Sequence, residues 1–572
     1  MKIDLTAKPF CLDEDGINWV QDTLANMTEE EKLGQIFCLV AYDDNPEMLR
    51  YFAKGLNAGG LMCRPMPTNG EAVSVINTLQ ENSKIPMLIA ANVESGGTGF
   101  TMEGTTVGSQ MQIAATGDPK YAGVLGDVVG AESHAVGGNW AFAPVIDIDM
   151  NFRNPITNTR TYGSNPDMVK RCGAEFTKAC QKHDVAVSIK HFPGDGHDER
   201  DQHLVTSVNG LSCEDWDSTY GEVYRASIEA GALTLMVGHI MQPAWSKALN
   251  PELKDEEILP GSLSHELLNG LLREKLGFNG MIVTDASSMN GMLIPMKRSK
   301  AVPLAIAAGC DMFLFVKNLE EDFDYMREGI RSGVITQERF DEAVTRILAT
   351  KAAIGLHRDK GIRSAEDAAK TVGCAAHRAM AKEVADMSIT LEKNIQDVLP
   401  ISPEKHKRVL FFPIDPTGVS FFTGEAISIN KVFIEKLRAR GFDVEEFVPT
   451  LTFEGNFSKY SDMEERYDLL IYSAALATKS NQTAVRIEWA QPMGANVPMF
   501  INAIPSIFVS LENPYHLIDV PRIKTYINTF GSNTFGVGDV VLDALIDKLL
   551  GKSEFKGKSP VDAFVGKWDT RI

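Results

Sequence analysis

The chain has 572 residues, of which 44% are hydrophobic and 23% are charged, with a net charge of −20 and a pI near 5.1. This composition is typical of a folded protein with large cores, and the length predicts more than one domain. Nucleic-acid binding requires a basic surface that releases counterions, so the acidic charge predicts no nucleic-acid partner.

The first residues do not combine a basic segment with an apolar stretch, and no run of about 18 apolar residues occurs. We therefore expect neither export nor membrane insertion, and a cytoplasmic location. The eight cysteines are scattered without a C-x-x-C pair, and several lie in apolar runs. They indicate reduced, mostly buried thiols rather than disulfides or zinc ligands.

Short apolar runs alternate with segments of helical periodicity through the first 360 residues. The strand candidates are 36–42, 60–65, 86–93, 141–148, 185–192, 234–241, 280–286 and 311–316, and the clearest helix candidates between them are 45–56, 71–82, 166–182, 216–231, 264–277, 302–309 and 320–333. Each strand candidate is an apolar run, as expected of parallel strands buried on both faces. Eight such units predict a (β/α)8 TIM barrel, with a doubly wound sheet as the alternative.

After helical segments at 337–355 and 378–394, the proline-containing and charged stretch 398–408 is typical of a surface linker. The pattern resumes with apolar runs at 409–414, 443–447, 468–474, 499–505 and 507–511 and a helical segment at 431–441. We predict a barrel domain at 1–375, a linker at 376–405, and a smaller C-terminal α/β domain, an αβα sandwich, at 406–572.

Polar side chains follow four of the predicted barrel strands: NVES after the third, KHFPGDG after the fifth, HIMQP after the sixth and TDASS after the seventh. The carboxyl ends of the strands form the catalytic face of a barrel. We therefore expect the active site at this face.

The stretch KHFPGDGHDERDQH places His191, His197 and His203 at intervals of six. This spacing fits neither one face of a helix nor a known zinc pattern, so we predict no metal. The two interpretations left open are a solvated charged loop and an acid–base loop.

Asp285 is a lone carboxylate at the end of an apolar strand, where an unpaired charge is costly unless it faces a polar cavity. It could instead cap the next helix. A strand-end carboxylate and a loop histidine held by an aspartate would supply the nucleophile and the general acid/base of a double displacement at an acetal carbon.

The chain resembles glycoside hydrolase family 3, and within it the NagZ-like β-N-acetylglucosaminidase branch. The motifs are MTEEEKLGQIF (27–37), APVIDIDMNFRNPITNTRTYG (143–163), KHFPGDGHDERDQH, VTDASSM (283–289), the join SITLEKN and VLPI (388–401), SLENPYHL (510–517) and KGKSPV (556–561). They follow the family's order over nearly the whole chain.

The resemblance implies Asp285 as the nucleophile, His203 as the general acid/base and Asp201 as the residue that orients its imidazole. The residues that it implies for binding the sugar are Lys190, His191 and Arg160. His239, in MVGHIMQP, resembles another landmark of the family and is a candidate for substrate positioning, with a hydrogen-bonded core histidine as the alternative. Met289 closes the nucleophile motif and is a further substrate-binding candidate.

The sequence departs from the family pattern at three places. The aspartate that usually binds the sugar after strand three is replaced by Asn92 or shifted to Glu94, so both are substrate-binding candidates. Asp195 stands where the KHFPGHG pattern has histidine, and Gln202 where serine or threonine is usual.

We therefore predict a retaining exo-β-N-acetylglucosaminidase, a β-N-acetylhexosaminidase that needs no metal or organic cofactor. Its substrate would be a small oligosaccharide or muropeptide from peptidoglycan or chitin, as in peptidoglycan recycling, without a membrane partner. The alternatives are a family 3 β-glucosidase, a non-catalytic sugar-binding relative, and a phosphorylase, because a neutral histidine base would not repel phosphate. A nucleotide-binding enzyme is disfavoured because no G-x-G-x-x-G or complete P-loop occurs.

Overall fold

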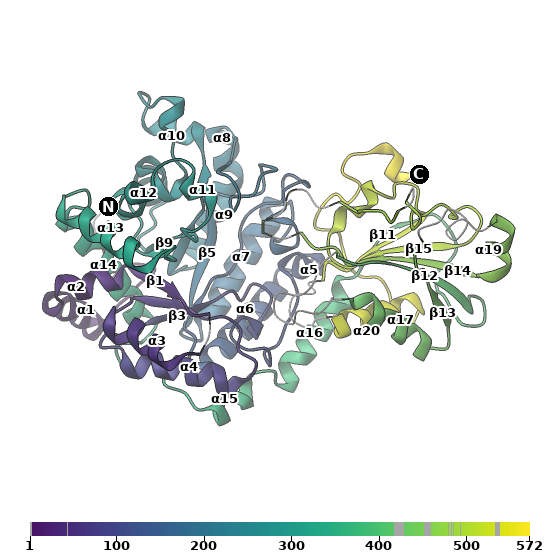
Figure 1. Cartoon of the computed structure of the whole chain (residues 1–572), viewed down its shortest axis with the longest axis horizontal. Helices are drawn as coiled ribbons and strands as arrows, with labels where there is room; N and C mark the ends of the chain where they lie inside the picture. The colour runs from purple at the N-terminus through teal and green to yellow at the C-terminus, as the bar shows by residue number, and fades with distance from the viewer. Residues whose placement is uncertain are drawn as a thin grey trace. The chain divides into compact units, whose positions relative to one another are not determined.

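The computed structural model describes residues 3–42, 44–416, 428–450, 459–478, 480, 481, 483, 486–491, 494–531 and 538–572. The chain forms two compact units (Figure 1). The first contains residues 1–106, 119–157 and 165–378, and the second contains residues 107–118, 158–164 and 379–572. Two short segments from between the strands of the first unit thus belong to the second.

The first unit is built on an eight-stranded parallel sheet in the order β10-β1-β2-β3-β4-β5-β7-β9. Its strands are β1 (Phe37–Val40), β2 (Gly60–Met62), β3 (Leu88–Ala91), β4 (Trp140–Ala141), β5 (Ala186–Phe192), β7 (Thr234–Val237), β9 (Met281–Thr284) and β10 (Phe313–Leu314). A parallel bridge between Val283 and Met312 joins the two ends of the sheet. This confirms the predicted barrel; seven of the eight apolar runs contain one of its strands, and the fourth, 141–148, begins at the last residue of β4.

Helices follow the strands and surround the sheet (Figure 1). They include α1 (Glu14–Asn26), α2 (Glu29–Gln35), α3 (Pro46–Arg50), α4 (Asn69–Asn82), α6 (Lys120–Val136), α7 (Pro166–Gln181), α8 (Cys213–Trp216), α9 (Glu222–Glu229), α10 (Pro243–Leu249), α11 (Asn290–Leu293), α12 (Arg298–Ala308), α13 (Leu319–Arg331), α14 (Gln337–Ala353) and α15 (Ala365–Thr371), and a π-helix covers Glu266–Lys275. Local sequence determines where several begin. For α4, the Thr68 hydroxyl accepts the Glu71 N–H while the Glu71 carboxylate accepts the Thr68 N–H, a reciprocal cap.

The second unit contains a six-stranded sheet in the order β11-β16-β15-β14-β12-β13. Its strands are β11 (Thr390–Asn394), β12 (Arg408–Ile414), β13 (Asp443–Glu446), β14 (Leu469–Ala474), β15 (Ser506–Ser510) and β16 (Thr525–Asn528), and only β11 pairs antiparallel to its neighbour. Its helices include α5 (Gln110–Ala115), α17 (Ile429–Ala439), α19 (Tyr460–Arg466) and α20 (Gly538–Leu549), and α16 (Ala375–Ser388) leads into β11. The predicted α/β domain is therefore present.

The apolar side chains of this sheet belong to two clusters, one on each face. One joins Val409, Phe411 and Ile471 to residues of α17 and α20, and the other contains Phe412 and Tyr472. Residues alternate between the two clusters along β12, because successive side chains of a strand point to opposite faces. The sheet is thus buried on both sides, as the apolar run 409–414 indicates.

Three details of the second unit differ from the expectations. Residues 499–505, one of the predicted apolar runs, form a turn and irregular structure rather than a strand. The strand β16 was not predicted, and the segment 376–405, expected as a linker, contains most of α16 and all of β11. Among the described residues, no helix is both long and apolar enough to cross a membrane.

Candidate active site

His203 lies in the loop that follows β5, and its imidazole is held by Asp201. The Nδ1 atom of His203 is 2.7 Å from Asp201 Oδ1, and the same oxygen accepts the His203 backbone N–H at 2.8 Å. Asp201 is buried, whereas 25% of the His203 side chain is exposed. Because a carboxylate oxygen accepts hydrogen bonds, Nδ1 carries the proton and Nε2 is the nitrogen that can exchange a proton with a substrate.

Asp285 follows β9 directly, and its side chain is 13% exposed. Burial by itself would raise the pKa of Asp285, but His191, His239, His203 and the Ala286 N–H together hold that pKa below its usual value. The carboxylate is therefore ionised at neutral pH, as a nucleophile must be. It does not cap α11, whose N-cap is Met289, so the helix-cap interpretation of Asp285 was wrong.

His191 connects Asp285 to a second buried carboxylate, Asp147, which follows β4. His191 donates from Nδ1 to Asp147 Oδ2 over 2.7 Å, and its Nε2 lies 3.9 Å from Asp285 Oδ2. Asp147 Oδ1 also accepts the backbone N–H groups of His191 and Asp195. Asp147 was not predicted from the sequence, although its position directly after the apolar run AFAPVI resembles that of Asp285.

Lys190 and Glu94 form an ion pair of 2.7 Å with side chains that are 3% and 16% exposed. Asn92, the other residue that could replace the family's aspartate, is solvent exposed. The structure therefore brings Glu94 to the predicted sugar-binding lysine. A buried ammonium and carboxylate can donate to and accept from sugar hydroxyls.

His239 follows β7 and is fully buried. Its Nε2 donates to the Ala286 carbonyl oxygen at 3.0 Å, and its Nδ1 is 2.8 Å from Ser262 Oγ. Burial lowers the pKa of His239, so the ring is neutral and fixes the residue after the predicted nucleophile. Met289 is also buried, and its backbone N–H donates to Ala286 as well.

Arg160 was predicted to bind the sugar, whereas no role was predicted for His197. Arg160 is half-buried and belongs to the second unit, in a short 3-10 helix (Asn158–Arg160). His197 is half-buried, and its Nδ1 accepts the Gly210 N–H at 3.4 Å. Among the described residues, the only group with the spacing of metal ligands is Asp13, Asp15 and His357, outside the predicted loop.

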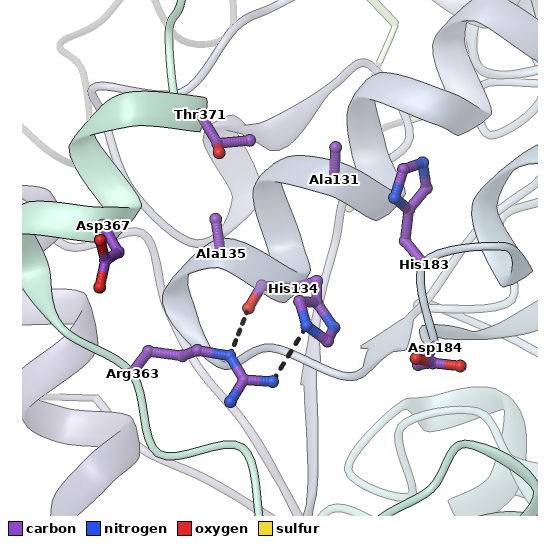
Figure 2. A pocket seen from close by; sticks show the side chains of 8 residues that line it. All are labelled: Ala131, His134, Ala135, His183, Asp184, Arg363, Asp367 and Thr371. Carbon is purple, nitrogen blue, oxygen red and sulfur yellow. Dashed lines mark hydrogen bonds between the residues drawn. The ribbon is translucent and has the colours of Figure 1, made fainter. Parts of the chain in front are cut away.

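A pocket of about 460 Å³ lies elsewhere in the first unit, where α6, the turn after α7, and α15 meet (Figure 2). Its lining residues are Ala131, His134, Ala135, His183, Asp184, Arg363, Asp367 and Thr371. Arg363 donates to the His134 carbonyl oxygen and to His134 Nε2, so its guanidinium already has partners. None of the predicted site residues lines this pocket, and we do not assign the active site to it.

The family assignment follows from comparison with known proteins. Residues 28–350 match the model of the glycosyl hydrolase family 3 N-terminal domain. The chain belongs to glycoside hydrolase family 3. It is 53% identical over 570 residues to a Cellulomonas fimi protein named β-N-acetylglucosaminidase/β-glucosidase, with full coverage of both chains.

Solved structures match nearly the whole chain. One titled "Beta-glucoside phosphorylase BglX bound to 2FGlc" is 43% identical, with a TM-score of 0.92 and coverage of 98% of this chain and 99% of that one. A family 3 β-N-acetylglucosaminidase from Paenibacillus, at 23% identity and a TM-score of 0.76 over 94% and 99% of the two chains, shares the fold. The chain is thus a family 3 glycosidase with a barrel followed by an α/β domain, which confirms the predicted family and enzyme class.

Proposed function

We propose that the chain is a retaining exo-β-glycosidase that releases terminal β-linked N-acetylglucosamine or glucose by double displacement. Asp285 attacks the anomeric carbon while His203 protonates the leaving oxygen; neutral His203 then deprotonates the acceptor that releases the sugar from Asp285. The observation on which this rests is the arrangement of an ionised strand-end carboxylate together with a loop imidazole whose Nδ1 is held by Asp201.

The choice between the two sugars depends on the residues after β3. Glu94 forms an ion pair with Lys190, the predicted sugar-binding lysine. The carboxylate beside this lysine therefore comes from position 94, two residues after the position at which the family has its aspartate. The Cellulomonas relative has both activities in its name, which supports a site that accepts both sugars. We further propose peptidoglycan or chitin fragments as the natural glycans and the cytoplasm as the location, on the sequence arguments alone.

A covalent trap tests the mechanism. A 2-deoxy-2-fluoro β-glucoside with an activated leaving group should inactivate the enzyme, and mass spectrometry of the digested protein should find the added sugar on Asp285. The Asp285→Ala variant should neither react nor release nitrophenol from the β-glucoside or the β-N-acetylglucosaminide. A labelled residue other than Asp285 would contradict the assignment.

Phosphorolysis is the second candidate. After the first step His203 is a neutral base, which does not repel an incoming phosphate as an ionised carboxylate would. The 43% identical structure is titled a β-glucoside phosphorylase. Added phosphate should then increase turnover and yield the sugar 1-phosphate, measured by chromatography; release of free sugar alone at all phosphate concentrations would leave hydrolysis as the reaction.

A further inference from the structure

Asp195 and Gln202 contact each other within the loop that contains His203. Gln202 Nε2 donates to Asp195 Oδ2 at 3.4 Å, and the two residues are 2% and 0% exposed. They are also the two positions in KHFPGDGHDERDQH at which the chain departs from the pattern described above. Because the two departures touch, they indicate one local arrangement rather than two independent changes.

Gln202 connects the His203 loop to the segment after β7 and to the start of α11. Its Oε1 accepts the His239 N–H at 2.7 Å, and its backbone carbonyl accepts the Gly291 N–H at 3.1 Å. The carbonyl of His203 itself accepts the Asn290 N–H at 3.1 Å. The Gln202 side chain is thus held to a residue after β7, and the carbonyls of Gln202 and His203 are held to the start of α11.

The positions that face Gln202 are glycines for a steric reason. A Cβ atom at Gly291 would lie 2.5 Å from the Gln202 carbonyl oxygen, and one at Gly238 would lie 3.0 Å from Gln202 Oε1. Side chains at these positions would push the glutamine out of its place. The surroundings therefore fit this residue closely.

Asp195 extends the same network toward the nucleophile. Its Oδ1 accepts the Asn154 Nδ2 group at 2.8 Å and the Gly196 N–H at 2.7 Å, and its own N–H donates to Asp147 at 2.8 Å. Asp147 in turn holds His191, which faces Asp285. Through Gln202 and Asp195, the loop of the acid/base is connected to the residues around the nucleophile.

We propose that Asp195 and Gln202 form a positioning pair that holds the His203 imidazole where it can protonate the leaving oxygen. The proposal rests on the proposed function, in which His203 is the general acid. Neither residue needs to touch the substrate. Loss of the pair should weaken acid catalysis specifically, because His203 keeps Asp201 while the loop loses the side-chain bonds from Gln202 to Asp195 and to the His239 N–H.

The dependence of the rate on the leaving group measures this effect. A dinitrophenolate departs without a proton, whereas methanol must be protonated as it leaves. The test compares kcat/KM for the 2,4-dinitrophenyl and methyl β-glycosides of the sugar that the wild type cleaves faster. It uses pH 8, where Asp195 is ionised.

Gln202→Ser should lower kcat/KM for the methyl glycoside by about tenfold or more and change that for the dinitrophenyl glycoside by less than about threefold, because general acid catalysis contributes about 10²- to 10⁴-fold. Asp195→Asn should act in the same direction. The double variant should be no worse than the more damaged single variant, because residues that act as one pair are not additive. Equal losses on both substrates, or additive losses, would overturn the proposal.

Two further variants separate the possible failures. Gln80 is a fully buried glutamine of α4 whose amide bonds both Met87 backbone groups, and Gln80→Ser should lower the Tm without changing the ratio of the two substrates. His203→Ala should show the same leaving-group dependence as Gln202→Ser, only stronger. If His203→Ala lacks it, the proposed function is wrong; if only Gln202→Ser lacks it, the positioning role is wrong.

Discussion

Replacing Asp195 by asparagine should stabilise the protein in alkaline solution. Burial, and next the neighbouring Asp147 carboxylate, raise the pKa of Asp195 from 3.8 to about 7, although Asn154 and the Gly196 N–H donate to it. The folded pKa lies above the unfolded one, so the contribution of Asp195 to stability is fully present below pH 4 and is lost as the pH rises to 7. Asparagine, which does not ionise, avoids that loss.

The size of the effect follows from the shift. About three pKa units correspond to about 4 kcal/mol above pH 7. The new amide N–H would face the Gln202 donor, and the lost hydrogen bond costs about 1 kcal/mol. The variant should therefore gain about 2–3 kcal/mol at pH 8 and lose about 1 kcal/mol at pH 4.

Thermal unfolding followed by circular dichroism at pH 4, 6 and 8 would measure this. In domains of 150–250 residues, 1 kcal/mol corresponds to about 2–4 °C, so a Tm increase of several degrees is expected at pH 8 only. A variant that is less stable than the wild type by the same amount at every pH would refute the reasoning. Asparagine at this position should also reduce activity, so stability and function would be opposed here.

Three further substitutions test other parts of the structure. Asp201→Asn keeps the shape of the contact to His203 but removes its charge, and should lower kcat/KM for the methyl glycoside about 5- to 15-fold, since charge-assisted bonds exceed neutral ones by about 1–1.5 kcal/mol. Glu94→Gln leaves the Lys190 ammonium without its counter-charge; it should lower the Tm and raise KM in nitrophenyl glycoside assays, and an unchanged KM would exclude Glu94 from sugar binding. Asp311→Asn removes the buried carboxylate shared by three arginines and should cost about 3–5 kcal/mol in urea unfolding, while kcat per folded molecule stays constant.

The barrel could be predicted because its strands are buried on both faces. Segments such as 185–192 and 280–286 are mainly apolar, with their charged residues near the carboxyl end, and the segments between the strands have helical periodicity. Each of the eight units can therefore be recognised separately. The strands of the second sheet were harder to predict from the sequence. The apolar run 499–505 forms turns, whereas β16 is a short strand with only two apolar residues, Tyr526 and Ile527, and its pairing with β15 and β11 determines its structure.

The candidate site divides in the same way. Asp285 could be proposed from the sequence because it is a carboxylate directly after an apolar strand, and the resemblance to the family's loop motif selected His203 and Asp201 as its partners. Asp147 and the contact between Asp195 and Gln202 were determined only by the tertiary structure, as was the choice of Glu94 over Asn92. Glu94 and Lys190 are 96 positions apart in the chain, and closing the barrel places the ends of β3 and β5 on the same face of the sheet. Local sequence patterns therefore determine which groups are available, and strand order determines which of them meet, because hydrogen bonds and ion pairs act over only a few ångströms.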